Sequence, residues 1–299
     1  MNSQTRQAYH ERMLTVLVYI QQHLDEALSL EDLAGVAHFS PYHFHRIFRG
    51  MVGESVKAHV RRLRLERAAQ QLKHSNEPVT RIAFAAGYET HEAFTRAFGG
   101  MFDEPPAKFR ETQRSLPYPA APSGVHYDPD AGPADFTTPR TGEHPMEVTI
   151  RQNPPLRVAV VRHVGPYNEV GQTWQKLMMW AGPRGLCGPN LRCLGLCHDD
   201  PEITPPDKIR YDACFVVGDD VQAEGEVGIQ TIAGGDYAVT MHHGPYEKLI
   251  ETYARLCGEW LPQSGRELAS APGYEVYLNN PQMTPPEKLI ADFVDNQLI

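Results

Sequence analysis

Two arginines stand at matching places in a repeated pattern of aromatic residues. Arg46 and Arg96 each lie between two phenylalanines in a Phe-x-Arg-x-Phe segment. On a helix, the two phenylalanines of such a segment share one face, and the arginine between them points away from that face. A guanidinium group can donate two hydrogen bonds to the edge of a guanine, or it can bind a phosphate group. The pattern therefore predicts two exposed side chains with the chemistry to recognise nucleic acid.

Each arginine needs a helix, a tight turn and a second helix to present it. The segment LAGVAHFSPYHFHRIF (33–48) fits this arrangement, with Ser40 as the cap and Pro41 in the first turn of the second helix. The segment IAFAAGYETHEAFTRAF (82–98) repeats the design with a turn one residue longer. The residues predicted to face outward from the two second helices are Tyr42, His45, Arg46 and Arg49, and then His91, Glu92, Thr95 and Arg96.

A long helix over about 55–74 is predicted to separate the two units. About 20 helical residues at ~1.5 Å each span roughly 30 Å, and a major groove recurs every ~34 Å along one face of B-DNA. One chain could fill two adjacent major grooves without a partner, so a monomer and a dimer both fit this arrangement. Arg49 and Arg61 would hold phosphates. Arg46 and Arg96 could read bases or clamp phosphates, and the sequence leaves both possibilities open.

The charge of the chain is divided unequally along its length. The whole chain carries a formal net charge of −9. Residues 1–116 contain 15 Lys and Arg against 13 Asp and Glu, a balance of +2, which leaves −11 for the rest. Because a polyanion is attracted to positive surface, only the amino-terminal part is suited to binding double-stranded DNA.

A stretch rich in proline and glycine separates the two parts. Residues 115–145 contain seven prolines and three glycines. Because proline removes backbone donors and fixes φ, this stretch is predicted to form neither helix nor strand, and to be an extended, exposed linker. The predicted domains are 1–114, which is all-α, and 146–299.

The carboxyl-terminal domain contains a repeat of its own. VAVVRHVGPYNEVGQTWQKL (158–177) recurs as YAVTMHHGPYEKLIETYARL (237–256), with a Gly-Pro-Tyr turn at the same place in both. Each half reads as a strand, a helix of about 15 residues and two shorter strands. The sequence predicts an α+β domain with pseudo-twofold symmetry, built from a repeated βαββ unit, with a ligand groove between the halves.

One carboxylate breaks this symmetry. Glu275 lies in the apolar strand pattern Gly-Tyr-Glu-Val-Tyr-Leu, whereas its repeat mate 80 residues earlier is Gly195. Glu275 and Tyr277 share one face of that strand. A buried carboxylate costs several kcal/mol unless a cation or hydrogen bonds compensate, and a bound organic cation would serve. Two alternatives stay open, namely an outward-facing strand and an internal arginine or tyrosine partner. Aromatic residues predicted to form cavity walls, or else simple core, are Tyr167, Trp174, Tyr253 and Tyr277.

The remaining composition excludes several classes of protein. The five cysteines show no CxxC pair, which predicts reduced core thiols and neither a zinc site nor a disulfide framework. No motif for a metal or another cofactor is found. No apolar run approaches the roughly 18 to 20 residues of a membrane span, and the amino terminus lacks a signal-peptide pattern, so a cytoplasmic location without membrane contact is expected.

The first domain resembles the DNA-binding domain of AraC/XylS-family transcription regulators. The segment GYETHEAFTRAFGGMFDEPPAKFR, which begins at Gly87, is similar to the family's signature around its second unit. The resemblance implies that the second helix of each unit enters the DNA. Several family members carry glutamine or tryptophan where this chain has Tyr42, His45 and His91, so the target sequence does not carry over.

The second domain resembles the GyrI-like effector-binding domain, and the whole arrangement is similar to the Rob type of AraC-family activators. The clearest matches are the two Gly-Pro-Tyr turns and the segment Gly-Tyr-Glu-Val-Tyr-Leu. In that domain a strand glutamate near the end of the chain faces the ligand, and Glu275 matches it. The resemblance implies an activator that responds to a small amphipathic or cationic molecule and acts with RNA polymerase.

Two other functions of the second domain are kept as alternatives. One is a hydrolase with Glu275 as its general base, although no Ser-His-Asp set, metal cluster or phosphate loop is found. The other is a protein-interaction module without a ligand, which a dry and fully packed groove would favour.

Overall fold

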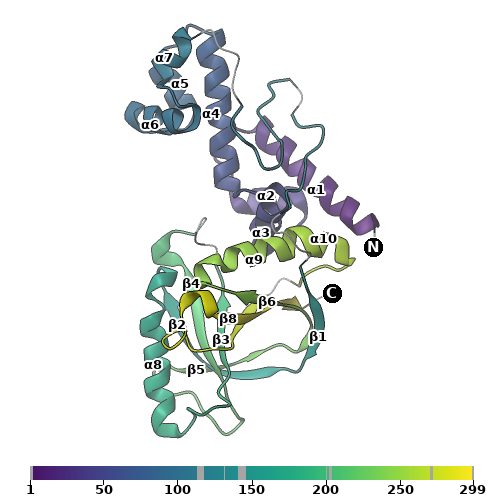
Figure 1. Ribbon diagram of the computed structural model, residues 1–299, viewed down its shortest axis with the longest axis vertical. Coiled ribbons are helices and arrows are strands. Elements are labelled where there is room, and N and C mark those ends of the chain that lie inside the picture. The colour runs from purple at the N-terminus through teal and green to yellow at the C-terminus, as the bar shows by residue number, and fades with distance from the viewer. Residues whose placement is uncertain are drawn as a thin grey trace. The chain divides into compact units, whose positions relative to one another are not determined.

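The computed structural model of this chain describes residues 3–112, 118–130, 132–140, 146–199, 201, 204–269 and 272–297. The chain divides into two compact units. One comprises Gln7–Arg140, and the other combines Met1–Arg6 with Thr141–Ile299. Figure 1 shows that the first is built from helices and the second around a sheet. The predicted domain limits at 114 and 146 stay a prediction.

The helical unit confirms the predicted pair of helix-turn-helix motifs. Its helices are α1 (Ser3–Gln22), α2 (Leu30–Ala37), α3 (Pro41–Val52), α4 (Val56–His74), α5 (Val79–Ala85), α6 (His91–Phe102) and α7 (Pro106–Glu111). The first motif is formed by α2 and α3, the second by α5 and α6, and α4 joins them (Figure 1). The long helix predicted over 55–74 is α4, with Ser55 as its cap.

Local sequence explains where these helices begin and end. The Ser29 hydroxyl accepts a hydrogen bond from the Asp32 amide and so caps α2. His38 ends α2 in the left-handed region, at φ 53°, and makes the predicted tight turn. Pro41 occupies the first position of α3, where its missing N–H costs nothing. In each motif the two phenylalanines that flank the arginine are fully buried.

The segment predicted to be an exposed linker is only partly so. Its described residues form no helix or strand, as expected from the prolines. However, Ser123, Val125 and Phe136 are buried, and the described residues 118–140 belong to the same compact unit as α2 to α7 and the part of α1 from Gln7 onward. The expectation of full exposure was therefore wrong. Backbone groups that proline-rich sequence leaves without regular partners here bond to side chains of the helices, which periodicity within the segment does not reveal.

The second unit contains one antiparallel sheet of eight strands among the described residues. The strands are β1 (Thr149–Asn153), β2 (Leu156–Val164), β3 (Cys193–Cys197), β4 (Arg210–Val216), β5 (Gly228–Ile232), β6 (Gly235–His243), β7 (Tyr274–Tyr277) and β8 (Ile290–Gln297). Their order is β1-β6-β8-β7-β3-β4-β2-β5. The helices α8 (Gly171–Ala181) and α9 (Leu249–Arg255) pack on one face of this curled sheet (Figure 1).

The predicted βαββ repeat is confirmed as β2-α8-β3-β4 and β6-α9-β7-β8. The structure adds one strand to each half. In sequence β1 precedes the first half and β5 precedes the second, but each pairs with the leading strand of the opposite half. The sheet is therefore symmetric about its centre, where β3 and β7 pair.

Candidate nucleic-acid interface and effector site

On the second helix of the second motif, two of the four residues predicted to face outward are exposed. On α6, Glu92 and Arg96 are exposed, and His91 and Thr95 are partly buried. Thr90 caps this helix by accepting a hydrogen bond from the Ala93 amide. Since Phe94 and Phe98 fix the opposite face in the core, Arg96 extends into solvent, with the geometry to reach a groove.

The first recognition helix differs. On α3, only 8% of the Arg46 surface is exposed, and His45 and Arg49 are partly buried. Helical geometry still places Arg46 on the face opposite Phe44 and Phe48, but its side chain is covered, so the predicted exposure is not met in this structure. The backbone of Tyr42 lies in α3, and its side chain is outside the part of the chain that the structure describes. Contact of these residues with DNA stays a prediction.

Several basic residues of α4 have structural roles that periodicity did not reveal. Arg64 donates hydrogen bonds to the carbonyl groups of Leu24 and Glu26, which follow α1. Arg67 donates to the carbonyl of Ala85. Arg62 is buried, with 4% of its surface exposed. Arg61 is exposed, as binding to phosphate requires.

In the second unit, Glu275 is a buried carboxylate, with 3% of its surface exposed. It accepts hydrogen bonds from the hydroxyl groups of Tyr277, at 2.7 Å, and Tyr253, at 3.4 Å. The Cys197 thiol donates to it at 3.5 Å. All three of these donors are neutral groups, so their hydrogen bonds solvate the charge without neutralising it. The prediction that Glu275 and Tyr277 share a strand face is confirmed, because Tyr274 and Val276 belong to the core on the opposite face.

Aromatic side chains gather beside this carboxylate. Trp174 meets the ring of Tyr277 with centroids 5.8 Å apart, in an edge-on geometry. The Tyr277 hydroxyl lies 2.9 Å from that of Tyr211, whose ring in turn contacts Tyr167. The structure thus brings together the four predicted ligand residues, Glu275, Tyr277, Tyr167 and Trp174, with Tyr211 joining them.

Sequence reasoning missed three members of this cluster, namely Tyr211, Tyr246 and Cys197. Tyr246 contacts the Tyr277 ring at 5.1 Å and is the repeat mate of Tyr167, so comparison of the halves could have found it. Tyr211 and Cys197 lie on β4 and β3, and only the strand pairing reveals their proximity. Burial raises the pKa of Tyr211 and Tyr277 well above the ordinary value and that of Tyr246 to about 12. These hydroxyls therefore remain protonated donors near neutral pH.

The five cysteines all lie within the described residues and form no disulfide, but the expectation of core thiols holds only in part. Cys214 and Cys257 are buried, Cys193 and Cys197 are partly exposed, and Cys187 is exposed. Among the described residues no group of His, Cys, Asp or Glu side chains has the arrangement of a metal site. No helix in the same residues has the length and apolar character needed to cross a membrane.

Two helix-turn-helix motifs on one long helix, followed by a duplicated α+β domain, define a DNA-binding regulator with a separate effector domain. Comparisons agree with this class: residues 33–112 match a helix-turn-helix domain family, and residues 146–293 match the GyrI-like small molecule binding domain. The chain belongs to the AraC/XylS family of transcription regulators and has the domain arrangement of the Rob type.

The curated relatives match only part of the chain. The multiple antibiotic resistance protein MarA of Escherichia coli (strain K12) is 36% identical over 98 residues, which are 33% of this chain and 77% of MarA. The transcriptional regulator Rob of Salmonella typhimurium (strain LT2) is 33% identical over 143 residues, which are 48% of this chain and 46% of Rob. The chain thus spans less than half the length of Rob.

Among solved structures, the C-terminal domain of EcmrR aligns with 52% of this chain and 98% of its own residues. Its TM-score is 0.41 and its sequence identity 19%.

Proposed function

We propose that the second domain of this regulator binds an organic cation at Glu275 and that the bound cation changes the activity of the first domain at promoters. The observation that carries this proposal is a carboxylate, 3% exposed, whose hydrogen-bond donors include two tyrosine hydroxyls and a thiol. The Rob-type arrangement favours an activator that works with RNA polymerase in the cytoplasm.

The surroundings of Glu275 favour a cation over other ligands. A buried carboxylate is costly, and neutral donors offset only part of that cost. A cation that carries apolar groups would add a direct charge attraction to Glu275 and pack against aromatic rings, whose faces attract positive charge. Trp174, Tyr246 and Tyr277 supply such rings on one side of the carboxylate. A neutral ligand could at most donate a hydrogen bond to Glu275, and an anionic ligand would be repelled by it.

Binding of a ligand requires these side chains to move. The Tyr253 ring lies edge-on against Phe293 with centroids 3.7 Å apart, and its hydroxyl contacts Glu275. Directly after α9, residues Leu256–Trp260 form a π-helical turn, a feature that often accompanies functional sites. We infer that displacement of Tyr253 opens the site. The packed rings also fit a domain without a ligand, and titration with a cation distinguishes the two.

Isothermal titration calorimetry of the full chain with tetraphenylphosphonium tests this proposal. We expect Glu275→Gln, which keeps the shape and removes the charge, to weaken binding by about tenfold or more, equal to ~1.4 kcal/mol. Glu251→Gln on the exposed part of α9 is the matched control and should leave binding unchanged. Neutral triphenylphosphine oxide should bind weakly to all three proteins. Absence of tetraphenylphosphonium binding, or equal binding by both variants, would refute the cation site and favour an interaction module.

We also propose that this domain is not a hydrolase. A general base needs a free lone pair aimed at a water molecule. Both carboxylate oxygens of Glu275 already accept hydrogen bonds, one from Tyr277 and the other from Tyr253 and Cys197. These donors occupy three of the roughly four lone-pair positions of the carboxylate, and hydrogen bonds that stabilise an ionised carboxylate make it a weaker base.

A further inference from the structure

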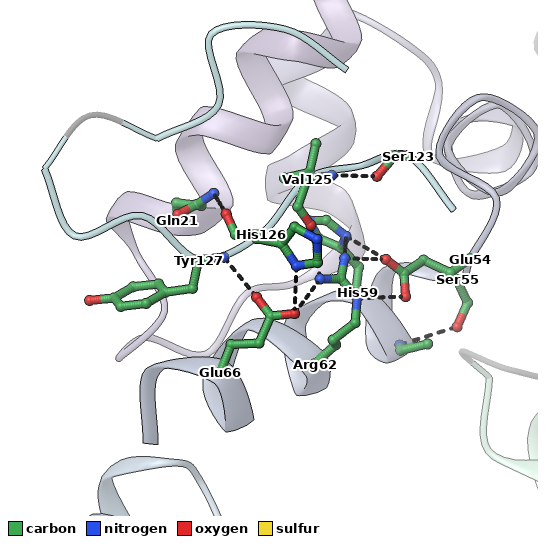
Figure 2. A network of polar contacts seen from close by, with 11 residues as sticks. Gln21, Glu54, Ser55, His59, Arg62, Glu66, Ser123, Val125, His126 and Tyr127 are labelled. Atoms are coloured by element: carbon green, nitrogen blue, oxygen red, sulfur yellow. Dashed lines mark hydrogen bonds and ion pairs between the residues drawn. The ribbon is translucent and has the colours of Figure 1, made fainter. Parts of the chain in front are cut away.

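The segment 123–136, apart from residue 131, packs on α1 and α4 beside the first helix-turn-helix motif through specific polar contacts (Figure 2). We call it the docking segment. Gln21 of α1 binds it twice. The side-chain amide of Gln21 donates to the His126 carbonyl at 2.8 Å, and its oxygen accepts from the Asp128 amide at 2.9 Å. Because Gln21 is buried and both of its polar ends are used, it fixes the backbone of the segment and not merely a side chain.

Two buried charges of α4 complete the contact. Glu66 accepts hydrogen bonds from the Tyr127 amide at 2.8 Å and from the His126 ring at 3.1 Å. Arg62 bridges Glu66, at 2.8 Å, and the Val125 carbonyl, at 2.9 Å. Glu66 is 2% exposed and Arg62 4%. Figure 2 shows these side chains converging on the segment from one face of α4.

Apolar and steric contacts anchor the same segment. Val125 is buried, and the Phe136 ring is stacked on that of His10 with centroids 4.3 Å apart. Prolines that flank the segment approach the end of α3 so closely that a Cβ on Gly53 would lie 2.6 Å from Pro122 and from Pro139. Gly53 adopts φ 83°, a conformation that also favours glycine. The fit therefore depends on glycine at this position.

Comparison of the two helix-turn-helix motifs shows a difference at one equivalent core position beside this network. At an offset of 50 residues, α3 and Glu54 in the first motif correspond to α6 and Glu104 in the second. His59 corresponds to Phe109, and each ring packs edge-on against the equivalent phenylalanine, at 5.6 Å and 5.2 Å. Phenylalanine thus fills this core position in one motif, while the other keeps a buried histidine.

The buried histidine connects the core of the first motif to the docking segment. His59 donates to Glu54 at 2.8 Å, and Arg62 donates to the same Glu54 oxygen at 2.6 Å. Arg62 then reaches Val125. Glu54 directly follows Gly53, the residue that ends α3. A continuous chain of hydrogen bonds therefore runs from the docking segment to the junction between the recognition helix α3 and α4.

We propose that the docking segment is a positioning element for DNA binding, which holds α3 in the orientation needed to read its groove. The segment is also the part of the chain that leads to the effector domain. Its release would loosen α3 and leave α6 unaffected, because the described core of the second motif contains none of the network. The hydrogen bonds that Gln21, Arg62 and Glu66 make to the segment exist only while it is docked, and Arg62 carries this contact to Glu54 at the end of α3, so docking and the order of α3 are coupled.

Val125→Asp in the full chain tests the proposal, since it places a carboxylate at a position of the segment that is buried. Ala134→Asp makes the same charge change at an exposed position of the segment and is the matched control. Hydrogen exchange should accelerate about tenfold or more for amides of α3 and the segment in Val125→Asp, and remain unchanged for α6 and α7. Ala134→Asp should resemble the wild-type chain.

The DNA readout uses a duplex selected from a randomised pool with the wild-type chain. Binding is measured by fluorescence anisotropy on that duplex and on two versions, each with one half scrambled. The half that α6 reads is identified as the half in which Arg96→Ala loses sequence discrimination. Val125→Asp should lose discrimination in the half read by α3 and keep it in the other. Unchanged discrimination in both halves after release of the segment would overturn the proposal, as would equal acceleration of exchange in α3 and α6.

His126→Ala serves if Val125→Asp does not fold. His126 is the partly exposed residue whose ring contacts Glu66, so its removal weakens docking without placing a charge in the core. The same selective effects on α3 are expected at smaller size. A fully wild-type profile of exchange and discrimination in His126→Ala, with Val125→Asp unfolded, would also overturn the proposal.

Discussion

Gly195 and Glu275 are repeat mates that lie opposite one another across the paired strands β3 and β7. The pseudo-twofold axis of the second domain passes between them. A Cβ on Gly195 would lie 2.4 Å from the hydroxyl oxygens of both Tyr211 and Tyr277. The absent side chain on one side of the axis therefore makes room for the hydroxyl groups that surround the carboxylate on the other side. Two glutamates at this place would face each other as like charges, which explains why the duplication is broken here.

Gly195→Ala should destabilise the second domain by about 1–3 kcal/mol, the range for inserting a methyl group into a packed core. The physical reason is the overlap with two hydroxyls that cannot both move without giving up their mutual hydrogen bond. Chemical denaturation followed by hydrogen exchange of β3 and β7 measures the effect. Gly188→Ala, where a Cβ meets nothing within 4 Å, is the control. Equal stability of the two variants would contradict the assignment.

Arg96→Ala should weaken binding to a selected DNA duplex by about 1–3 kcal/mol and relax the preference for one base pair, if the arginine reads a base. Arg46→Ala should do the same at a second position. Arg81→Ala on α5, whose side chain is 76% exposed in an ion pair with Glu77, is the control. Anisotropy titrations with single-base variants of the duplex measure the preference. Equal loss for every variant would show that the arginine clamps a phosphate.

His59 should make the stability of the first unit sensitive to pH. Burial lowers the pKa of His59 below its ordinary value of 6.5, although Glu54 opposes this in part. The pKa of His59 is lower in the folded chain than in the unfolded chain. The contribution of neutral His59 to the free energy of unfolding is therefore complete above pH ~6.5 and declines as the pH falls below that value. We expect His59→Phe, which introduces the residue type found at the equivalent Phe109 of the second motif, to flatten that decline.

Hydrogen exchange of α4 amides between about pH 5 and 7.5, corrected for intrinsic rates, measures this dependence. His74→Phe on the exposed end of α4 provides the control and should keep the wild-type slope. A slope that is unchanged in His59→Phe would mean that the ring does not take up a proton on unfolding.

Asp212 should contribute stability to the second domain at neutral pH. Burial raises its pKa, but hydrogen bonds from Arg162 and His198 outweigh burial and lower the pKa to about 2. The lowered pKa of Asp212 corresponds to ~2 kcal/mol in the free energy of unfolding. This contribution is present above pH ~4 and is lost as the pH falls through about 2. Asp212→Asn should therefore destabilise at pH 7 but not near pH 2, as read from exchange of β4 amides. The exposed Asp207→Asn should have no effect at either pH.

Much of this architecture follows from local features of the sequence. Helix starts were predictable from local sequence. The Ser55 hydroxyl accepts a hydrogen bond from an unpaired amide in the first turn of α4, and Pro41 has no amide N–H to leave unpaired at the start of α3. Both duplications were visible in the sequence. The two copies of each repeat keep the same spacing of phenylalanines or of Gly-Pro-Tyr turns, although many other side chains differ between the copies. The unusual status of Glu275 was also predictable, since comparison with Gly195 needs only the repeat.

Contacts between distant parts of the chain were decided only by the tertiary structure. Periodicity along α4 does not reveal that Arg62 is buried and donates a hydrogen bond to the carbonyl of Val125, 63 residues away. The docking segment gave no signal of its own because its backbone, and not its side chains, makes most of the contacts. Similarly, only the pairing of β3 with β4 and β7 places the Tyr211 hydroxyl beside that of Tyr277. A sequence pattern specifies which face of an element a residue occupies, whereas its partner depends on which element packs on that face.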